Sequence, residues 1–143
     1  MVSSERIIAD SRQSASVHVR IGAELGQLVL VRAIAETAAL LSEFTLDEVA
    51  DIRMALDEAA TCLILAAAPG SQIRCEFIAD GFRMRITVRG VCAEPDPVNE
   101  SGLGWNVLHT ITDHLAVEHA PYDTVRSGWP VVVTFSRVRR LHR

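Results

Sequence analysis

Residues 45–64 read TLDEVADIRMALDEAATCLI, and this stretch decides the fold because its pattern predicts one long amphipathic helix. Thr45 and Glu48 match a capping box, in which each side chain accepts a hydrogen bond from the other residue's backbone N–H. We expect the helix to run to about Ala67, because the Pro-Gly pair at 69–70 stops it. Five residues at helical spacing form its apolar side: Val49, Ile52, Leu56, Ala59 and Leu63.

A strand and a second helix are predicted before this segment. Residues 16–21 (SVHVRI) alternate between apolar and polar side chains, as a half-buried strand does. Residues 24–41 are rich in Ala, Leu and Val at helical spacing, which predicts an amphipathic helix. The residues expected to share its buried face are Leu25, Leu28, Val31, Ala35 and Ala38.

The pattern after the long helix changes to the two-residue period of strands. Residues 71–79 and 82–89 predict a hairpin, because Asp80 and Gly81 between them are typical turn residues. A Pro-containing acidic loop follows at 93–101. The last predicted elements are a short helix from Trp105 to about His114 and closing strands at 115–119 and 131–138.

This order of elements predicts an α+β fold. The helices occur in blocks and the strands pair through short turns, which favours a two-layer sandwich over a doubly wound parallel sheet. We expect a mostly antiparallel sheet with the helices packed on one face. The expected organisation is a flexible arm at 1–15, a single domain at 16–138 and a basic tail at 139–143.

Composition narrows the class of protein. The chain has 143 residues, of which 49% are hydrophobic, so one compact domain can bury a real core. Its formal charge of −4 gives no general attraction to nucleic acid or anionic membranes. All 14 basic residues are Arg, so no lysine can contact a phosphate or form a Schiff base.

Cysteine usage and the polar N-terminus indicate a cytoplasmic protein. The three cysteines are far apart and lack metal-binding spacing, so free thiols are expected. The longest apolar run, 59–68, is too short to span a bilayer, and no signal peptide is recognised. The basic residues at 137–143 lack interleaved aromatics, which favours a solvated strand end over nucleic-acid binding.

Two local patterns are candidates for chemistry. Asp51, Glu58 and Cys62 fall near one line of the long helix. They form either a solvated helix edge or a wall of a cleft in which Glu58 acts as a general base. Gly102-Leu103-Gly104 before the short helix lets a ligand approach the backbone and the free N–H groups, or it simply forms a tight turn.

The two patterns together carry a family resemblance. LDEAATCLI at 56–64 and SGLGWNVLHTITDHLAVE at 101–118 are similar to the first nucleotide box and the glycine box of the GHKL (Bergerat) ATP-binding fold. Within that superfamily, the chain from Ser16 to Arg137 resembles the serine-kinase anti-sigma factors of the RsbW and SpoIIAB type. The resemblance implies that Glu58 is the catalytic base and that Asp113 fills a characteristic acidic position.

Several positions depart from the family pattern. The family has a Mg²⁺-binding Asn where this chain has Cys62, and a neutral thiol is a poor ligand for Mg²⁺. The family's Asp-x-Gly-x-Gly box becomes Gly90, Cys92 and Glu94, and its final Gly-Thr becomes Gly128 followed by Trp. The positions that the resemblance assigns to nucleotide binding are Cys62, Gly90, Gly102, Gly104 and Gly128. We therefore expect no bound cofactor and no kinase activity, with Mg-ATP or Mg-ADP bound only if the site still functions.

The resemblance also implies partners. Anti-sigma factors of this type form homodimers, sequester an RNA polymerase sigma factor and are released by a STAS-type anti-anti-sigma factor. Arg32 lies where relatives carry an Arg used in partner docking, although it could equally extend along the helix edge. Neither direct nucleic-acid binding nor membrane binding is expected.

Two other functions remain open from the sequence. One is an active ATP-dependent serine kinase that phosphorylates the anti-anti-sigma factor, with Glu58 as base and Asp51 or Asp57 as a substitute metal ligand. The other is a dimeric interaction module with a partner other than a sigma factor. Phosphorylation, a competing partner and thiol oxidation are the alternative causes of release.

Overall fold

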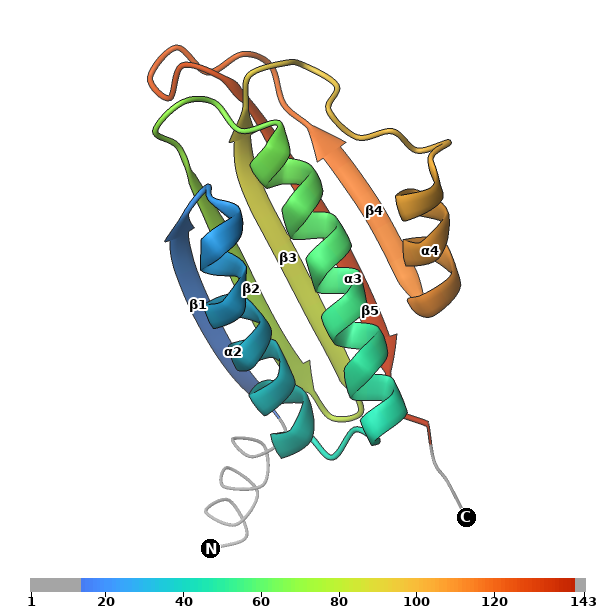
Figure 1. The fold of residues 1–143 in the computed structure, drawn as a ribbon. Helices are drawn as coiled ribbons and strands as arrows, with labels where there is room; N and C mark the ends of the chain where they lie inside the picture. The colour runs from blue at the N-terminus through green and yellow to red at the C-terminus, as the bar shows by residue number, and fades with distance from the viewer. Residues whose placement is uncertain (1–13, 141–143) are drawn as a thin grey trace, which may run out of the picture.

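A computed structural model describes residues 14–140 of the chain. Within these residues, five strands form one antiparallel sheet in the order β1-β2-β3-β5-β4, and three α-helices cover one face of it (Figure 1). The predicted two-layer α+β fold is therefore confirmed. The strands are β1 (Ser14–Gly22), β2 (Gln72–Asp80), β3 (Arg83–Cys92), β4 (His114–His119) and β5 (Trp129–Val138), and the helices are α2 (Leu28–Leu41), α3 (Leu46–Leu65) and α4 (Leu103–Ile111), with a short 3₁₀ helix η1 (Leu25–Gln27) before α2.

The long helix α3 forms as its sequence predicts. The Glu48 N–H donates to Thr45 Oγ1 (3.2 Å), and the Thr45 N–H donates to Glu48 Oε1 (2.9 Å), so the capping box is present. The five predicted core residues of this helix are all buried. The helix ends at Leu65 rather than near Ala67, because the backbone of residues 66–68 bonds to the end of β3.

Other boundaries differ from the predictions for local reasons. The predicted helix at 24–41 begins with η1, and Leu25 is half exposed instead of buried. Helix α4 ends at Ile111 rather than near His114, because Thr112 is extended and the Asp113 N–H donates to Ser136 O (2.8 Å). Strand β3 continues past Arg89 to Cys92, where it pairs with the start of β5.

The ends of the chain are only partly described. Residues 1–13 of the expected arm and residues 141–143 of the expected tail lie outside the described residues, and the remaining arm positions, 14–15, belong to β1. The described part of the expected tail forms ion pairs at the surface. Arg139 pairs with Glu43 (2.9 Å) and Arg140 with Asp113 (2.7 Å), so both guanidinium groups are engaged.

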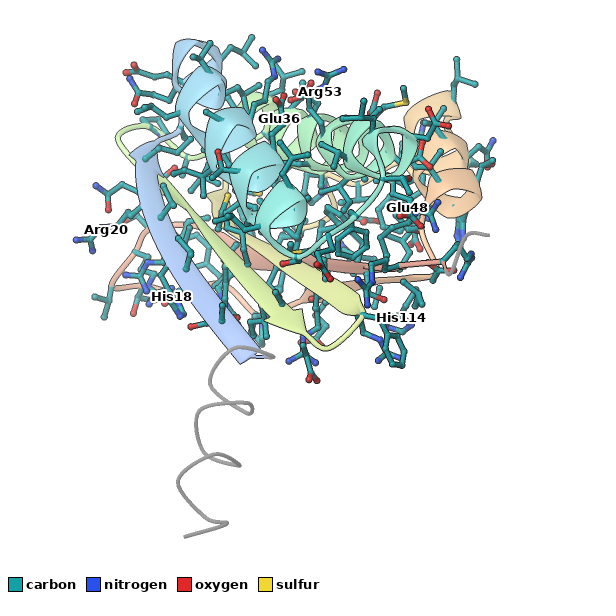
Figure 2. The ribbon with its side chains drawn as sticks, turned by 90° about the horizontal axis from the view of Figure 1, so that it is seen from below. His18, Arg20, Glu36, Glu48, Arg53 and His114 are labelled. Atoms are coloured by element: carbon teal, nitrogen blue, oxygen red, sulfur yellow. The ribbon has the colours of Figure 1, made fainter. Side chains whose placement is uncertain are left out.

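The core lies between the helices and one face of the sheet. Its largest fully buried side chains include Phe77, Phe135, Ile52, Leu56, Leu63 and Ile86. Figure 2 shows His18 and Arg20 on the side of the sheet away from the helices, and Glu36 and Arg53 on the outer surface of the helices. No helix in the described part of the chain is long and apolar enough to cross a membrane.

Candidate functional site

Glu58 of α3 lies against the first turn of α4. A Cβ added at Gly104 would overlap Glu58 Oε2, so the missing side chain at this position lets the carboxylate approach the α4 backbone. Gly102 is the N-cap of α4, and a Cβ there would lie 2.9 Å from the Asn99 amide nitrogen. The two glycines of the GLG turn therefore let the side chains of Glu58 and Asn99 approach the backbone closely.

A cavity of about 280 Å³ lies between α3, the loop before α4 and the start of α4. Four of the predicted site positions line it: Glu58, Cys62, Gly102 and Gly104. Apolar side chains, including Val98, Trp105 and Leu108, form much of the remaining wall. Small-molecule sites usually occupy about 300–1,000 Å³, so this cavity lies just below that range.

Cys62 enters the cavity as a neutral thiol. Its Sγ donates to Pro97 O across 3.8 Å. Burial raises the pKa of Cys62, and the nearby Glu58 and Glu94 carboxylates raise it further. Burial also raises the pKa of Cys92, to about 11, with added contributions from Cys62 and Glu94. Burial and the two carboxylates therefore disfavour the thiolate form at this end of the site.

Gly90 and Gly128 do not line the cavity. Gly90 pairs with Val131 in the sheet, and a Cβ there would lie 3.3 Å from Leu63 Cβ. A Cβ at Gly128 would lie 2.6 Å from Val91 Cγ1 and 2.7 Å from a backbone oxygen. The packing of α3 on the sheet explains Gly90, and the close contact with the end of β3 explains Gly128. Neither glycine needs a ligand to explain it.

Arg32 also lies apart from the cavity. Its Nε donates to Asp57 Oδ1 (2.6 Å), which links α2 to α3 at the surface. The two side chains remain 39% and 33% exposed. Adjacent carboxylates on α3 thus serve different neighbours, because Asp57 faces α2 while Glu58 faces α4.

The substitute metal ligands considered from sequence are both engaged by arginines. Asp57 is held by Arg32, and Asp51 pairs with Arg137 (3.3 Å). Neither aspartate lines the cavity that contains Glu58. The structure therefore gives neither of them a position beside the predicted base.

Asp113 anchors the end of β5 instead of facing the cavity. The Val138 N–H and the Arg140 Nη2 each donate to its carboxylate across 2.7 Å, and Arg137 lies at 3.4 Å. Burial alone would raise the pKa of Asp113, but the Val138 N–H and the two guanidinium groups hold it below its ordinary value of 3.8. Sequence reasoning missed this cluster because its partners are 24 to 27 residues apart.

A second feature that the sequence analysis missed is an exposed apolar surface on α2. Val29 is 64% exposed and Leu41 is 81% exposed, although both lie within a helix whose opposite side is buried. The signal was the abundance of apolar residues on both sides of this helix. We define the outer face of α2 as Val29, Leu30, Ala33, Leu40 and Leu41, all of which are exposed.

The architecture is a two-layer α+β domain with an antiparallel sheet, and comparisons with known proteins show which proteins it is similar to. No family model matches the chain. Over 106 residues it is 28% identical to the anti-sigma-F factor RsbW of Mycobacterium tuberculosis, in strains CDC 1551 / Oshkosh and ATCC 25618 / H37Rv. The alignment covers 73% of this chain and 62% of those relatives, so the chain spans less than two thirds of their length.

A solved structure has a similar fold. The crystal structure of the RsbU and RsbW domains of a Mycobacterium tuberculosis protein superimposes with a TM-score of 0.65 at 16% identity, over 90% of this chain and 34% of that chain. The chain is thus similar in sequence to proteins named anti-sigma-F factor RsbW and shares the fold of an RsbW domain, in agreement with the resemblance of its two boxes.

Proposed function

We propose that this protein is an anti-sigma factor that sequesters an RNA polymerase sigma factor and releases it to an anti-anti-sigma partner without phosphoryl transfer. The observation that carries the proposal is the exposed outer face of α2, with Arg32 at its edge. Exposed apolar residues gathered on one helix mark a protein-binding surface. Similarity to proteins named anti-sigma-F factor RsbW supports a sigma factor as the partner.

The contacts of Arg32 suit partner docking. Only its Nε is bonded within residues 14–140, so both terminal nitrogens are free to hold a partner's carboxylate. The bond to Asp57 fixes the guanidinium at the surface, which lowers the entropy lost on binding. The same face would also serve the homodimer that the family resemblance implies.

The cavity is a poor match to a magnesium nucleotide, which supports a mechanism without transfer. Phosphoryl transfer requires positive charge around the phosphates. Neither Arg nor Lys lines the cavity within the described residues, and Glu58 lies against α4 where a phosphate would bind. The Cys62 thiol replaces a hard oxygen ligand. The residues of this cavity therefore do not fit a magnesium nucleotide.

A second candidate function is the serine kinase that phosphorylates an anti-anti-sigma factor. One observation favours it: Glu58 lines the cavity beside the GLG turn, where a general base would act. Both candidates predict sigma-factor binding, and they differ in whether a nucleotide is needed.

The test is direct capture. The purified chain is immobilised, and each sigma factor of the bacterium that encodes it is titrated by biolayer interferometry. The proposal expects one sigma factor to bind tightly without added nucleotide. If no sigma factor binds, the better explanation is that the protein is a dimeric interaction module with a partner other than a sigma factor.

A further inference from the structure

Three arginines lie side by side on the sheet face that the helices leave open. Arg20 of β1 is opposite Arg74 of β2, and Arg74 is opposite Arg89 of β3. All three are exposed, while their neighbours along each strand, such as Ile73 and Cys75, are buried toward the helices. Figure 2 shows Arg20 on this open side. We call these three residues the arginine row.

The arginine row is unpaired within the described part of the chain. Between residues 14 and 140, none of its guanidinium groups forms an ion pair or a hydrogen bond. Glu76 lies in the next register position, but it pairs with His18 (3.2 Å). Among the described residues, Arg83 and Arg85 of β3 form no ion pair either, whereas six arginines do: Arg32, Arg53, Arg126, Arg137, Arg139 and Arg140.

Such an arrangement costs stability in the isolated protein. Neighbouring strands are about 4.8 Å apart, and like charges directly opposite each other in a sheet repel. None of the three guanidinium groups pairs with a carboxylate of the described residues, so an anion laid across the row would relieve the repulsion. The row is therefore better suited to binding an anionic ligand than to stabilising the fold.

The surface over the row is hollowed. A depression of about 480 Å³ lies over the row. Its lining residues are His18, Val19 and Arg20 of β1, Arg74, Cys75 and Glu76 of β2, and Arg89 of β3. Because the arginines are exposed, a ligand here would remain partly in solvent. Small-molecule sites usually bury about 70–90% of their ligand, so this surface fits a segment of a macromolecule better.

We propose that the arginine row is a docking surface for an acidic segment of a partner protein, with two or three carboxylates that pair bidentately with the guanidinium groups. The arginine row lies on the opposite side of the sheet from the outer face of α2, so it is a separate surface from the proposed sigma-factor site. The proposal therefore stands whether or not that site is correct.

Charge favours an acidic protein segment over nucleic acid. Glu76 lies beside the row, two residues after Arg74 on β2. Arg89 is opposite Val132 of β5, and Val132 is opposite Glu118 of β4, so Glu118 ends the line of strand partners that contains the row. A continuous phosphate backbone would meet these carboxylates, and the whole chain is already negative. A protein segment can place its few carboxylates on the arginines alone. A second copy docked face to face would bring two arginine rows together.

The test uses a fluorescein-labelled peptide in which Glu and Ser alternate, titrated with the full chain by fluorescence anisotropy. We expect binding that weakens as salt is raised, because exposed charges are screened. Arg74→Gln should weaken it about fivefold, the upper range for one exposed ion pair. Arg53→Gln removes the same charge from the outer surface of the helices (Figure 2) and should leave binding unchanged.

Several outcomes would overturn the proposal. They are no binding by the unmodified chain, an equal loss in both variants, or tighter binding of a single-stranded oligonucleotide of matched charge. Self-association that Arg74→Gln abolishes would assign the row to a second copy instead. Thermal unfolding separates a folding defect from lost binding, since relief of like-charge repulsion predicts that Arg74→Gln melts no lower than the unmodified chain.

Discussion

Glu58 and Gly104 are in direct contact, with Glu58 Oε2 in the space that a Cβ at position 104 would occupy. The contact joins the middle of α3 to the first turn of α4. It places a carboxylate at the end of α4 where the helix dipole attracts an anion. A phosphate at this helix end would have to share the space with that carboxylate.

Arg32→Glu tests the surface proposed for the sigma factor. The change replaces the guanidinium beside the outer face of α2 with a carboxylate and should weaken sigma-factor binding at least about tenfold, as expected when an interface arginine is a hot spot. Fold stability should fall by only about 1 kcal/mol, because the lost ion pair with Asp57 is partly exposed and screened by solvent. Biolayer interferometry and urea unfolding measure the two effects.

Two matched variants sharpen this result. Arg53→Glu breaks the neighbouring surface pair with Glu36 and should leave sigma-factor affinity unchanged. Asp57→Asn keeps the Arg32 guanidinium but removes the carboxylate that fixes it, so it should weaken binding less than Arg32→Glu does. If Arg53→Glu weakens binding as much as Arg32→Glu does, general surface charge explains the effect and Arg32 has no specific role.

Gly128→Ala should destabilise the fold although position 128 lies in no ligand cavity. The new Cβ would fall 2.7 Å from the Cys92 backbone oxygen, so strands β3 and β5 would have to separate at their ends. We expect a loss of about 1–3 kcal/mol, typical of overpacking. Gly26→Ala is the control, because a Cβ there meets nothing within 4 Å. Equal urea midpoints for the two variants would contradict the packing explanation.

Glu48 and Asp113 predict how stability depends on pH. Burial raises the pKa of Glu48, but backbone N–H groups of Arg140 and Thr45 outweigh it, so its folded pKa lies below the ordinary value of 4.5. Asp113 is likewise below its ordinary 3.8. Groups with a depressed folded pKa stabilise above the unfolded pKa and lose that contribution as the pH falls through the folded pKa.

The unfolding free energy should therefore be steady from neutral pH down to about pH 5 and fall at lower pH. Asp113→Asn should cost about 1–3 kcal/mol at neutral pH, because hydrogen bonds to a charged acceptor are lost, and should flatten the acid slope. Asp96→Asn changes an exposed carboxylate and should do neither. An unchanged acid slope in Asp113→Asn would show that this group does not stabilise the fold.

The three thiols should differ in reactivity. Burial raises the pKa of Cys75 to about 12 and that of Cys92 to about 11, and both are fully covered, whereas Cys62 is only half-buried. Iodoacetamide at mildly alkaline pH should modify Cys62 first, as followed by mass spectrometry, and all three after denaturation. Equal labelling of the native protein at Cys75 and Cys62 would contradict the described packing.

Local signals allowed much of the fold to be predicted. The capping box at Thr45 and the regular apolar spacing of α3 act within a few residues, so sequence alone located that helix. The end of α4 was misplaced because a long-range bond from Asp113 to Ser136 draws the chain into the sheet. Such a bond leaves no mark in the helical pattern.

The candidate site was predictable only in part. The spacing of Glu58 and Cys62 and the GLG turn correctly indicated residues that meet at one cavity. Gly90 and Gly128 were assigned there by resemblance, yet their neighbours in the fold are packing contacts. The arginine row depends on strand register, which one sequence does not specify across three strands.

The most direct measurement of the central claim is the affinity of the chain for its sigma factor, determined by calorimetry once in Mg-ATP and once in EDTA without nucleotide. Our account predicts the same tight binding under both conditions, because the surface around Arg32 and α2 acts without the cavity at Glu58. Binding that appears only with Mg-ATP would contradict it and establish a working nucleotide site.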